Sequence, residues 1–222
     1  MKILKDIAKA SDVADLQSDL SRFEEYCNKN KLELSVEKCF YVCFSRKNSK
    51  SIIDLGYKLA DHPLQRCHSI HDLGVIHDSQ LLFDKHIDHI IRKASRALGF
   101  IVRNTKDFTG LKPIKVLYCS YIRSVLEYAS QVWNPRYDVY VNGIEQVQKN
   151  FLRILDFKAR KRSLDYLDRC RRYHFLPLYL RREISDVTFL IKIINGSIDC
   201  PELLSQIGFR TYTKKPLPSK CP

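Results

Sequence analysis

The spacing of the apolar residues changes near residue 80, and this change constrains the fold more than any other feature of the sequence. Before it, apolar residues gather in runs that are too short for helices. After it, they recur every three or four residues over long stretches, which is the period of one face of an α-helix. The sequence therefore predicts a small α+β part followed by an all-helical part, with no long flexible linker between them.

The first part is expected to begin with a helix and to continue with short strands. Apolar residues recur at steps of three and four at Val13, Leu16, Leu20, Phe23 and Cys27. Ser11 or Asp12 is the expected N-cap of this helix. The run Cys39–Phe44 is aromatic and β-branched, which is typical of a strand covered on both faces.

A hairpin and a further strand are expected next. Leu55–Ala60 and Leu64–Cys67 flank Asp61-His62-Pro63, whose residue types favour a turn. The further strand is expected at Leu73–Ile76.

Long helices are expected after residue 80. Their apolar stripes run, in turn, from Phe83 to Ile101, from Leu111 to Val132, from Ile144 to Leu155 and from Leu180 to Ile194. Pro113 fits the first turn of the second helix, and Asn195-Gly196 is the expected C-cap of the last. The proline-rich tail from Lys214 to Pro222 is expected to be disordered.

The chain is strongly basic, with 38 Lys and Arg against 25 Asp and Glu and a formal net charge of +13. This excess favours polyanionic partners, because neutralising phosphates releases their counterions. An anionic membrane surface is the competing partner, but the basic residues are spread over most of the chain rather than gathered on one short amphipathic helix. A soluble protein with solvated charge is the remaining alternative.

The chain is expected to be intracellular, in the nucleus or the cytoplasm. No apolar run approaches the ~18 residues needed to cross a bilayer, and Met1–Asp6 has no apolar signal core. The eight cysteines are scattered, so reduced and mostly buried thiols are expected rather than a disulfide framework.

No metal site is expected. Cys39 and Cys43 lie four residues apart, and His86 and His89 lie three apart. However, the sequence has no CxxC pair, the cysteines fall in a predicted strand and the histidines in a predicted helix.

Two groups of basic residues are candidates for binding nucleic acid. On the helix from Phe83, Lys85, Arg92, Arg96 and Arg103 fall on one side at about 100° per residue, over roughly 27 Å. An ordinary solvated helix face is the alternative for this stripe.

The second group follows the third long helix. It contains Lys158, Arg160, Lys161 and Arg162, then Arg169, Arg171, Arg172, Arg181 and Arg182, among Tyr166, Tyr173, His174 and Tyr179. Basic residues among aromatics suit phosphate neutralisation with stacking on bases or sugars. A nuclear-import signal or a solvated loop are the alternatives.

Known catalytic signatures are absent. The sequence has no GxxxxGK[ST], GxGxxG, HExxH or GxSxG motif. The carboxylate pairs close in sequence, Glu24-Glu25, Asp84 with Asp88, and Asp165 with Asp168, lie beside Lys and Arg. We interpret them as ion pairs on helix surfaces rather than as ligands of two metal ions.

Several motifs in one order carry a resemblance to a known family. In the first part they are Asp15-Leu16-Gln17, Leu20, Phe23, Cys27-x2-Asn30-x-Leu32-x-Leu34-x3-Lys38-Cys39, Phe44-Ser45-Arg46 and Asp72-Leu73-Gly74-Val75. In the second part they are Phe83-x2-His86-Ile87, Lys93-Ala94, Leu98-Gly99-Phe100-Ile101, Leu117-Tyr118, Arg123-Ser124-x-Leu126-Glu127-Tyr128, Val132-Trp133-x-Pro135, Ile144-Glu145-x-Val147-Gln148, Phe151-Leu152-Arg153 and Asn195-Gly196-x-Ile198-Asp199-Cys200-Pro201. This order closely resembles the end of the palm and the thumb of reverse transcriptases from Jockey-like non-LTR retrotransposons.

The resemblance implies a division of the chain. Residues 1–80 would be the C-terminal part of the palm subdomain, a small antiparallel remnant of a helix and short strands. Residues 81–210 would be the all-helical thumb and connection, and residues 211–222 a disordered tail. Met1-Lys2-Ile3 resembles the residues that follow the family's aromatic-Ala-Asp-Asp motif, so the catalytic aspartates would be missing.

The resemblance also assigns roles to matched residues. Lys38 resembles a lysine placed near the departing pyrophosphate, where it could neutralise or protonate a leaving group. Asp72, Leu73, Gly74 and Val75 resemble the primer grip, in which a tight turn brings backbone against the primer end. The alternatives are a surface lysine before a strand for Lys38 and an ordinary hairpin glycine for Gly74.

The function implied is that of a fragment of an RNA-directed DNA polymerase that grips an RNA or DNA primer–template duplex and is inactive alone. Mg²⁺ would be needed only in a complete enzyme, and no cofactor is expected in this chain. Its further partner would be the missing fingers and palm half. Two alternatives are a non-enzymatic RNA- or DNA-binding helical module derived from a retrotransposon, and a relic that scarcely folds because its palm sheet is incomplete.

Overall fold

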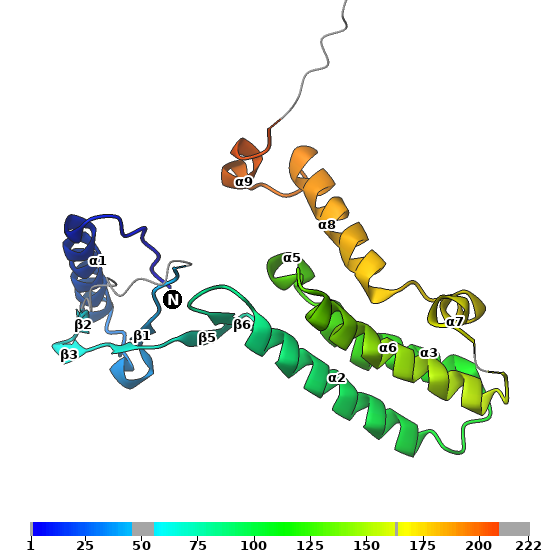
Figure 1. Ribbon diagram of the computed structural model, residues 1–222. Coiled ribbons are helices and arrows are strands. Elements are labelled where there is room, and N and C mark those ends of the chain that lie inside the picture. Colours follow the sequence, from blue (N-terminus) through cyan, green and yellow to red (C-terminus); the bar gives the residue numbers. More distant parts are fainter. Residues whose placement is uncertain (1, 46–55, 163, 209–222) are drawn as a thin grey trace, which may run out of the picture. The chain divides into compact units, whose positions relative to one another are not determined.

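The protein combines helices with three small two-stranded sheets, in agreement with the expected α+β class (Figure 1). The computed structural model describes residues 2–45, 56–162 and 164–208. The chain divides into two compact units, Met1–His89 and Ile90–Pro222. The expected disordered tail lies outside the described residues.

The first unit begins with helix α1 (Ala10–Lys29), which confirms the predicted amphipathic helix but not its N-cap. The N-cap is Lys9, and Asp12 lies one turn inside the helix. The Asp12 carboxylate accepts the backbone N–H groups of Ala8 and Lys9 at 2.8 and 2.7 Å. These two hydrogen bonds lower the pKa of Asp12.

The strands are shorter than the sequence predicts. Within the predicted strand Cys39–Phe44, only β1 (Phe40–Tyr41) is paired as a strand, after a short 3-10 turn η1 (Val36–Lys38). Phe40 and Phe44 are exposed, so coverage on both faces was a wrong expectation. β1 pairs in parallel with β4 (Gln65–Arg66), which also corrects the all-antiparallel expectation.

The predicted hairpin is present, but its turn begins one residue earlier, at Ala60 rather than Asp61. β2 (Lys58–Leu59) pairs antiparallel with β3 (His62–Pro63), so His62 and Pro63 belong to a strand. Ala60 and Asp61 form the turn in the left-handed region. The Gln17 side chain holds this hairpin to α1, because its amide donates to the Lys58 carbonyl and accepts from the Lys58 N–H at 2.9 and 3.0 Å.

A second hairpin replaces the predicted strand Leu73–Ile76. β5 (Ser69–Asp72) and β6 (Val75–Asp78) are antiparallel, and Leu73 and Gly74 form the turn between them. Both turn residues have positive φ, 45° and 83°, which favours a two-residue loop matched to the strand twist.

Two side chains of the first unit bind backbone groups between this hairpin and the first turn of helix α2 (Asp84–Asn104). The Asp78 carboxylate accepts the backbone N–H groups of Gln80, Leu82 and Phe83. Burial opposes its ionisation, but these donors outweigh burial and lower its pKa. His86 is 1% exposed, and its Nδ1 accepts the Ile76 N–H at 3.2 Å.

The second unit is helical and is built around α6 (Asp138–Lys158). The chain runs out along α2, returns along α3 (Leu111–Leu117), and runs out again along α6 (Figure 1). The Ile91 side chain lies 3.0 Å from where a Cβ on Gly143 would be, so this glycine allows α2 and α6 to approach closely. Tyr118 stacks on Phe151 with ring centroids 3.9 Å apart.

The predicted second long helix is not continuous. After α3 it widens into a π-helix, η2 (Tyr118–Arg123), tightens again in α4 (Ser124–Glu127), and breaks before α5 (Ser130–Trp133). Ala129 has a φ of 52° at the break. The buried Trp133 indole donates to the Tyr128 carbonyl at 2.8 Å, which satisfies a backbone group at the break.

Three more helices follow α6. They are α7 (Tyr166–Tyr173), α8 (Leu178–Ile194) and α9 (Pro201–Ser205). The predicted end of α8 is confirmed, since Asn195 is its C-cap and Gly196 follows with a φ of 71°. The apolar stripe of α8 is not its buried face: Ile184, Val187 and Ile191 are all about half exposed.

The cysteines are less buried than expected. Among the described residues seven cysteines are free thiols, of which Cys27 and Cys170 are buried and the other five are partly exposed. The expectation of mostly buried thiols was therefore wrong.

Candidate nucleic-acid interface

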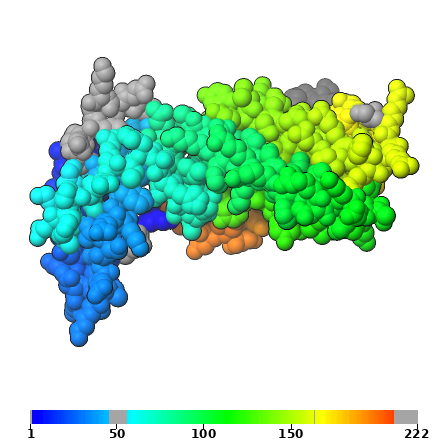
Figure 2. All heavy atoms as spheres, turned by 90° about the horizontal axis from the view of Figure 1, so that it is seen from below, coloured from blue at the N-terminus to red at the C-terminus, as the bar shows by residue number. Residues whose placement is uncertain are grey.

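Helix α2 separates an apolar face from a basic face. Its buried apolar residues are Ile87, Ile90, Ala94, Leu98 and Ile101. Lys85, Arg92, Arg96 and Arg103 are exposed and lie on the opposite side, about 180° away at 100° per residue. We call the three arginines of the second unit the α2 arginine stripe. In Figure 2, the green part of α2 near residue 100 is exposed at the molecular surface.

An exposed aromatic side chain lies beside the α2 arginine stripe. Phe100 is 61% exposed and falls about 60° from the stripe on the helix. Gly99 lies on the other side, and the Arg103 guanidinium passes 3.4 Å from where a Cβ on Gly99 would be. The stripe therefore combines cations with one ring that a base or sugar could contact.

Arg96 and Arg103 form no ion pair within residues 2–45, 56–162 and 164–208, so their charge is not neutralised by a described carboxylate. An exposed arginine without an ion pair can bind a phosphate group. Its planar guanidinium can donate two parallel hydrogen bonds to two phosphate oxygens.

The second basic group is divided by the structure into internal and exposed residues. Lys158 at the end of α6 donates to the carbonyls of Thr105 and Lys106, which follow α2. This ammonium therefore holds the α2–α3 loop. Arg160, Lys161 and Arg162 are exposed and remain candidates for phosphate contact.

The arginines of α7 mostly point into the protein. Asp156 on α6 pairs with Arg169 and Arg172 at 2.8 Å each, and Tyr173 donates to the same carboxylate at 2.8 Å. Burial and the hydrogen bond to Asp156 raise the pKa of Tyr173 to about 12. Arg169, Arg172 and Tyr173 therefore join α6 to α7. They are engaged inside the protein, although the sequence suggested that they would contact nucleic acid.

The arginines of α8 are also engaged inside the helical unit. Arg181 binds Glu127 through two nitrogens, and this pairing raises the pKa of Arg181. Arg182 is 1% exposed, and its Nε donates to Asn134 at 3.1 Å. Burial lowers the pKa of Arg182.

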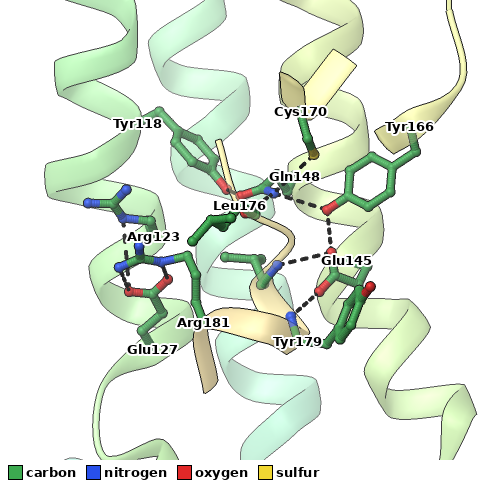
Figure 3. A network of polar contacts seen from close by, with 11 residues as sticks. Tyr118, Arg123, Glu127, Glu145, Gln148, Tyr166, Cys170, Leu176, Tyr179 and Arg181 are labelled. Carbon is green, nitrogen blue, oxygen red and sulfur yellow. Dashed lines mark hydrogen bonds and ion pairs between the residues drawn. The ribbon is translucent and has the colours of Figure 1, made fainter. Parts of the chain in front are cut away.

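A polar network inside the second unit was not anticipated from the sequence (Figure 3). Glu145 on α6 accepts the backbone N–H groups of Leu178 and Tyr179 at 3.3 and 2.6 Å, and the Tyr166 hydroxyl also donates to it. Gln148 accepts from Tyr118 at 2.9 Å.

The network joins elements that are distant in the sequence. Gln148 also donates to Tyr166 and to the Leu176 carbonyl, at 3.0 and 2.9 Å. Burial is the main cause that raises the pKa values of Tyr118 and Tyr166, so both hydroxyls stay protonated donors. The sequence could have indicated that these two polar residues are buried. Glu145 and Gln148 directly follow Ile144 and Val147 of the apolar stripe, so they lie at the edge of the buried face of α6.

The remaining candidate residues lie in the first unit. Lys38 ends η1 and is exposed. Asp72, Leu73, Gly74 and Val75 form the β5–β6 turn, in which Leu73 is 79% exposed and Val75 is buried. Lys2 pairs with the Asp72 carboxylate, and their hydrogen bond lowers the pKa of Asp72.

In the described part of the chain, no group of three or more His, Cys, Asp or Glu side chains could hold a metal ion. None of its helices is both long enough and apolar enough to span a membrane.

No protein-family model matches the sequence, and no curated protein or solved structure matches it significantly.

Proposed function

We propose that this chain is the palm-end and thumb part of an RNA-directed DNA polymerase, and that it grips a primer–template duplex. The observation that carries the proposal is the α2 arginine stripe, with the exposed Phe100 beside it and the buried face of the same helix opposite. The ordered motifs of the sequence give the enzyme class, and the stripe gives the surface that binds.

The dimensions of the stripe suit a nucleic-acid backbone. Arg92 to Arg103 spans about 17 Å at about 1.5 Å per residue. A duplex strand advances about 3.4 Å along the axis per phosphate, so this length follows about five phosphates. Because the contacts would be to phosphates, the grip would depend on salt and little on base sequence.

The stripe is tested by replacing its three arginines. We expect R92Q/R96Q/R103Q to bind a 20-base-pair RNA/DNA hybrid ~10–100-fold more weakly in fluorescence anisotropy at about 0.1 M salt. The slope of log affinity against log salt should fall in magnitude by about 2–3, since each lost phosphate contact removes about 0.9.

A matched control removes the same charge elsewhere. Lys31, Lys112 and Arg136 are exposed and lie outside α2, so K31Q/K112Q/R136Q changes the net charge equally. Equal loss of affinity in the two triple variants would show that net charge, and not the α2 arginine stripe, holds the duplex.

The chain is proposed to lack nucleotidyl transfer of its own. Its sequence contains no aromatic-Ala-Asp-Asp motif, and in complete enzymes of the resembled family such aspartates hold the Mg²⁺ ions. We expect no dNTP incorporation in a primer-extension assay with Mg²⁺, under conditions where the same protein sample binds the primer–template. Incorporation above a no-protein control would refute this part of the proposal.

A second function is a non-enzymatic RNA- or DNA-binding module. It is favoured by one observation: the helical unit that carries the stripe has its own buried core, including Ile144, Phe151 and Leu155. The two functions differ in ligand preference. A polymerase thumb should prefer a primer–template duplex over a single strand of equal length, whereas a general module should bind both with similar affinity.

A further inference from the structure

We propose that the C-terminal end of α6 binds a single-stranded stretch of nucleic acid, with Phe157 stacking on a base. Phe157 lies in the last turn of α6 and is 86% exposed, more than any other large apolar side chain in the described part of the chain. At about 100° per residue it falls on the side of α6 opposite the buried Leu155. The ring is therefore open to solvent, and an aromatic ring stacks on bases of any identity.

Exposed cations flank this ring. Arg153 lies one turn earlier on the same face of α6. Arg160 lies just past the end of the helix, and its N–H donates to the Phe157 carbonyl at 3.1 Å. Lys161 and Arg162 follow and are exposed as well. None of the four cations forms an ion pair with a described carboxylate, so all four are available to the phosphates on either side of a stacked base.

The carboxylates at this end of the helical unit do not neutralise these cations. Asp156 in the last turn of α6 is buried and is bound by two arginines of α7. Asp168 pairs with Arg171 within α7. Asp107 in the α2–α3 loop and Asp165 before α7 are exposed, but they are outnumbered by the four cations.

The basic turn after α6 is held in place by hydrogen bonds. The Lys161 N–H donates to the Asp156 carbonyl, and the Arg172 guanidinium donates to the Arg162 carbonyl, at 3.0 Å each. Arg160 has a φ of 48°, the left-handed conformation in which glycine is the usual residue after a helix. The chain thus keeps a cation where glycine would be less strained. Cations that are already positioned lose less conformational entropy when they bind.

The site adjoins the end of the α2 arginine stripe. Lys158 donates to the carbonyls of Thr105 and Lys106, so the C-terminal ends of α2 and α6 lie side by side in the helical unit (Figure 1). Arg103, the last arginine of the stripe, lies two residues before Thr105. The inference rests on the proposed function in one respect, because a strand that leaves the duplex on α2 would pass next to Phe157.

The surroundings of the ring favour a single strand over a duplex and over a membrane surface. A base inside a duplex is already stacked on its neighbours, so a protein ring gains most from an unpaired base. A membrane surface would need a broad apolar helix face. The residues one turn before and just after Phe157 on this face are instead Arg153 and Arg160.

The experiment compares ligands that differ only in an unpaired stretch. The full chain is titrated by fluorescence anisotropy with a blunt 20-base-pair RNA/DNA hybrid and with the same hybrid carrying a 5′ or a 3′ overhang of about six nucleotides. A single strand of about twelve nucleotides is titrated in parallel. We expect at least one overhang to raise the affinity about tenfold, which corresponds to the stacking of one base.

Variants separate stacking from apolar contact and from charge. F157L should abolish the overhang advantage because it has no ring, whereas F157W should keep it. R160G should weaken binding of the overhanging hybrid severalfold without lowering the Tm, because glycine fits the left-handed conformation. Y137A removes an exposed aromatic side chain at the other end of α6 and should leave all affinities unchanged.

The outcomes decide the inference separately from the proposed function. R92Q/R96Q/R103Q should weaken binding of the blunt hybrid and leave the ratio of the overhanging to the blunt affinity unchanged. If the wild-type chain does not bind the blunt hybrid, the proposed function fails, and binding of the single strand that F157L weakens still supports this site.

Equal affinity of the wild-type chain for blunt and overhanging hybrids would overturn the inference. So would an overhang advantage that F157L retains, or absence of binding to both the hybrids and the single strand. Binding to vesicles of anionic phospholipid that F157L abolishes, without any overhang advantage, would assign the surface to a membrane instead.

Discussion

Several buried residues of this chain are ionisable, including His86, Glu145 and Arg182. His86 is the clearest example, because it is buried while its Nδ1 holds the backbone of β6. Burial, with smaller contributions from His89, His77 and His71, lowers the pKa of His86 to about 4. The neutral imidazole is thus part of the folded first unit.

The folded state should lose stability as pH falls through the window between the two pKa values of His86. The unfolded chain takes up the proton near pH 6.5 and the folded chain only near pH 4, so the unfolded state binds more protons between these values. The free energy of unfolding should therefore fall by on the order of 3 kcal/mol from pH 7 to pH 4 through this group.

Urea denaturation of the wild-type chain and of H86N at pH 7 and pH 4.5 tests this. Asn keeps an acceptor for the Ile76 N–H and does not titrate. The wild-type chain should lose more stability between the two pH values than H86N does. Identical losses would mean that other groups, such as the carboxylates, account for the acid sensitivity.

At the scale of elements, one side chain in the interior of α6 joins it to two other helices. Glu145 on α6 receives two backbone N–H groups at the start of α8 and the Tyr166 hydroxyl of α7. It therefore fixes three helices at one point. The positive end of α8 adds to the preference for a carboxylate there.

Replacing this carboxylate by an amide should destabilise the helical unit. E145Q keeps the size of the side chain but directs an N–H₂ group at donors, so the free energy of unfolding should fall by about 2–3 kcal/mol. Thermal and urea denaturation followed by circular dichroism measure it. E183Q on the exposed side of α8 is the control and should change stability by less than about 0.5 kcal/mol. A similarly small effect of E145Q would show that the network is not structural.

At the scale of the whole molecule, the sequence predicted where helices and strands occur better than it predicted where a helix widens or breaks. The helices from Phe83 and Ile144 are confirmed, because their apolar stripes face the core continuously. The stripe from Leu111 to Val132 looks equally regular, yet the chain forms a π-helix at Tyr118 and breaks at Ala129. Such local changes depend on tertiary partners, here Phe151 for Tyr118, which periodicity does not contain.

The candidate site could be predicted only in part for a similar reason. The α2 arginine stripe follows from helix geometry alone, and its exposure agrees with that geometry. The basic residues after α6 could not be sorted in advance, because Asp156 and Glu127, which engage Arg169, Arg172 and Arg181, are distant in sequence. The sequence alone does not distinguish an arginine in an internal ion pair from an arginine at the surface.

The break between α4 and α5 has a practical consequence. It buries the only tryptophan of the chain, Trp133, one turn from Ser130 in the same short helix. The tryptophan fluorescence of the protein therefore comes entirely from one buried indole in the helical unit. Its emission offers a label-free optical signal for the folding of the helical unit alone.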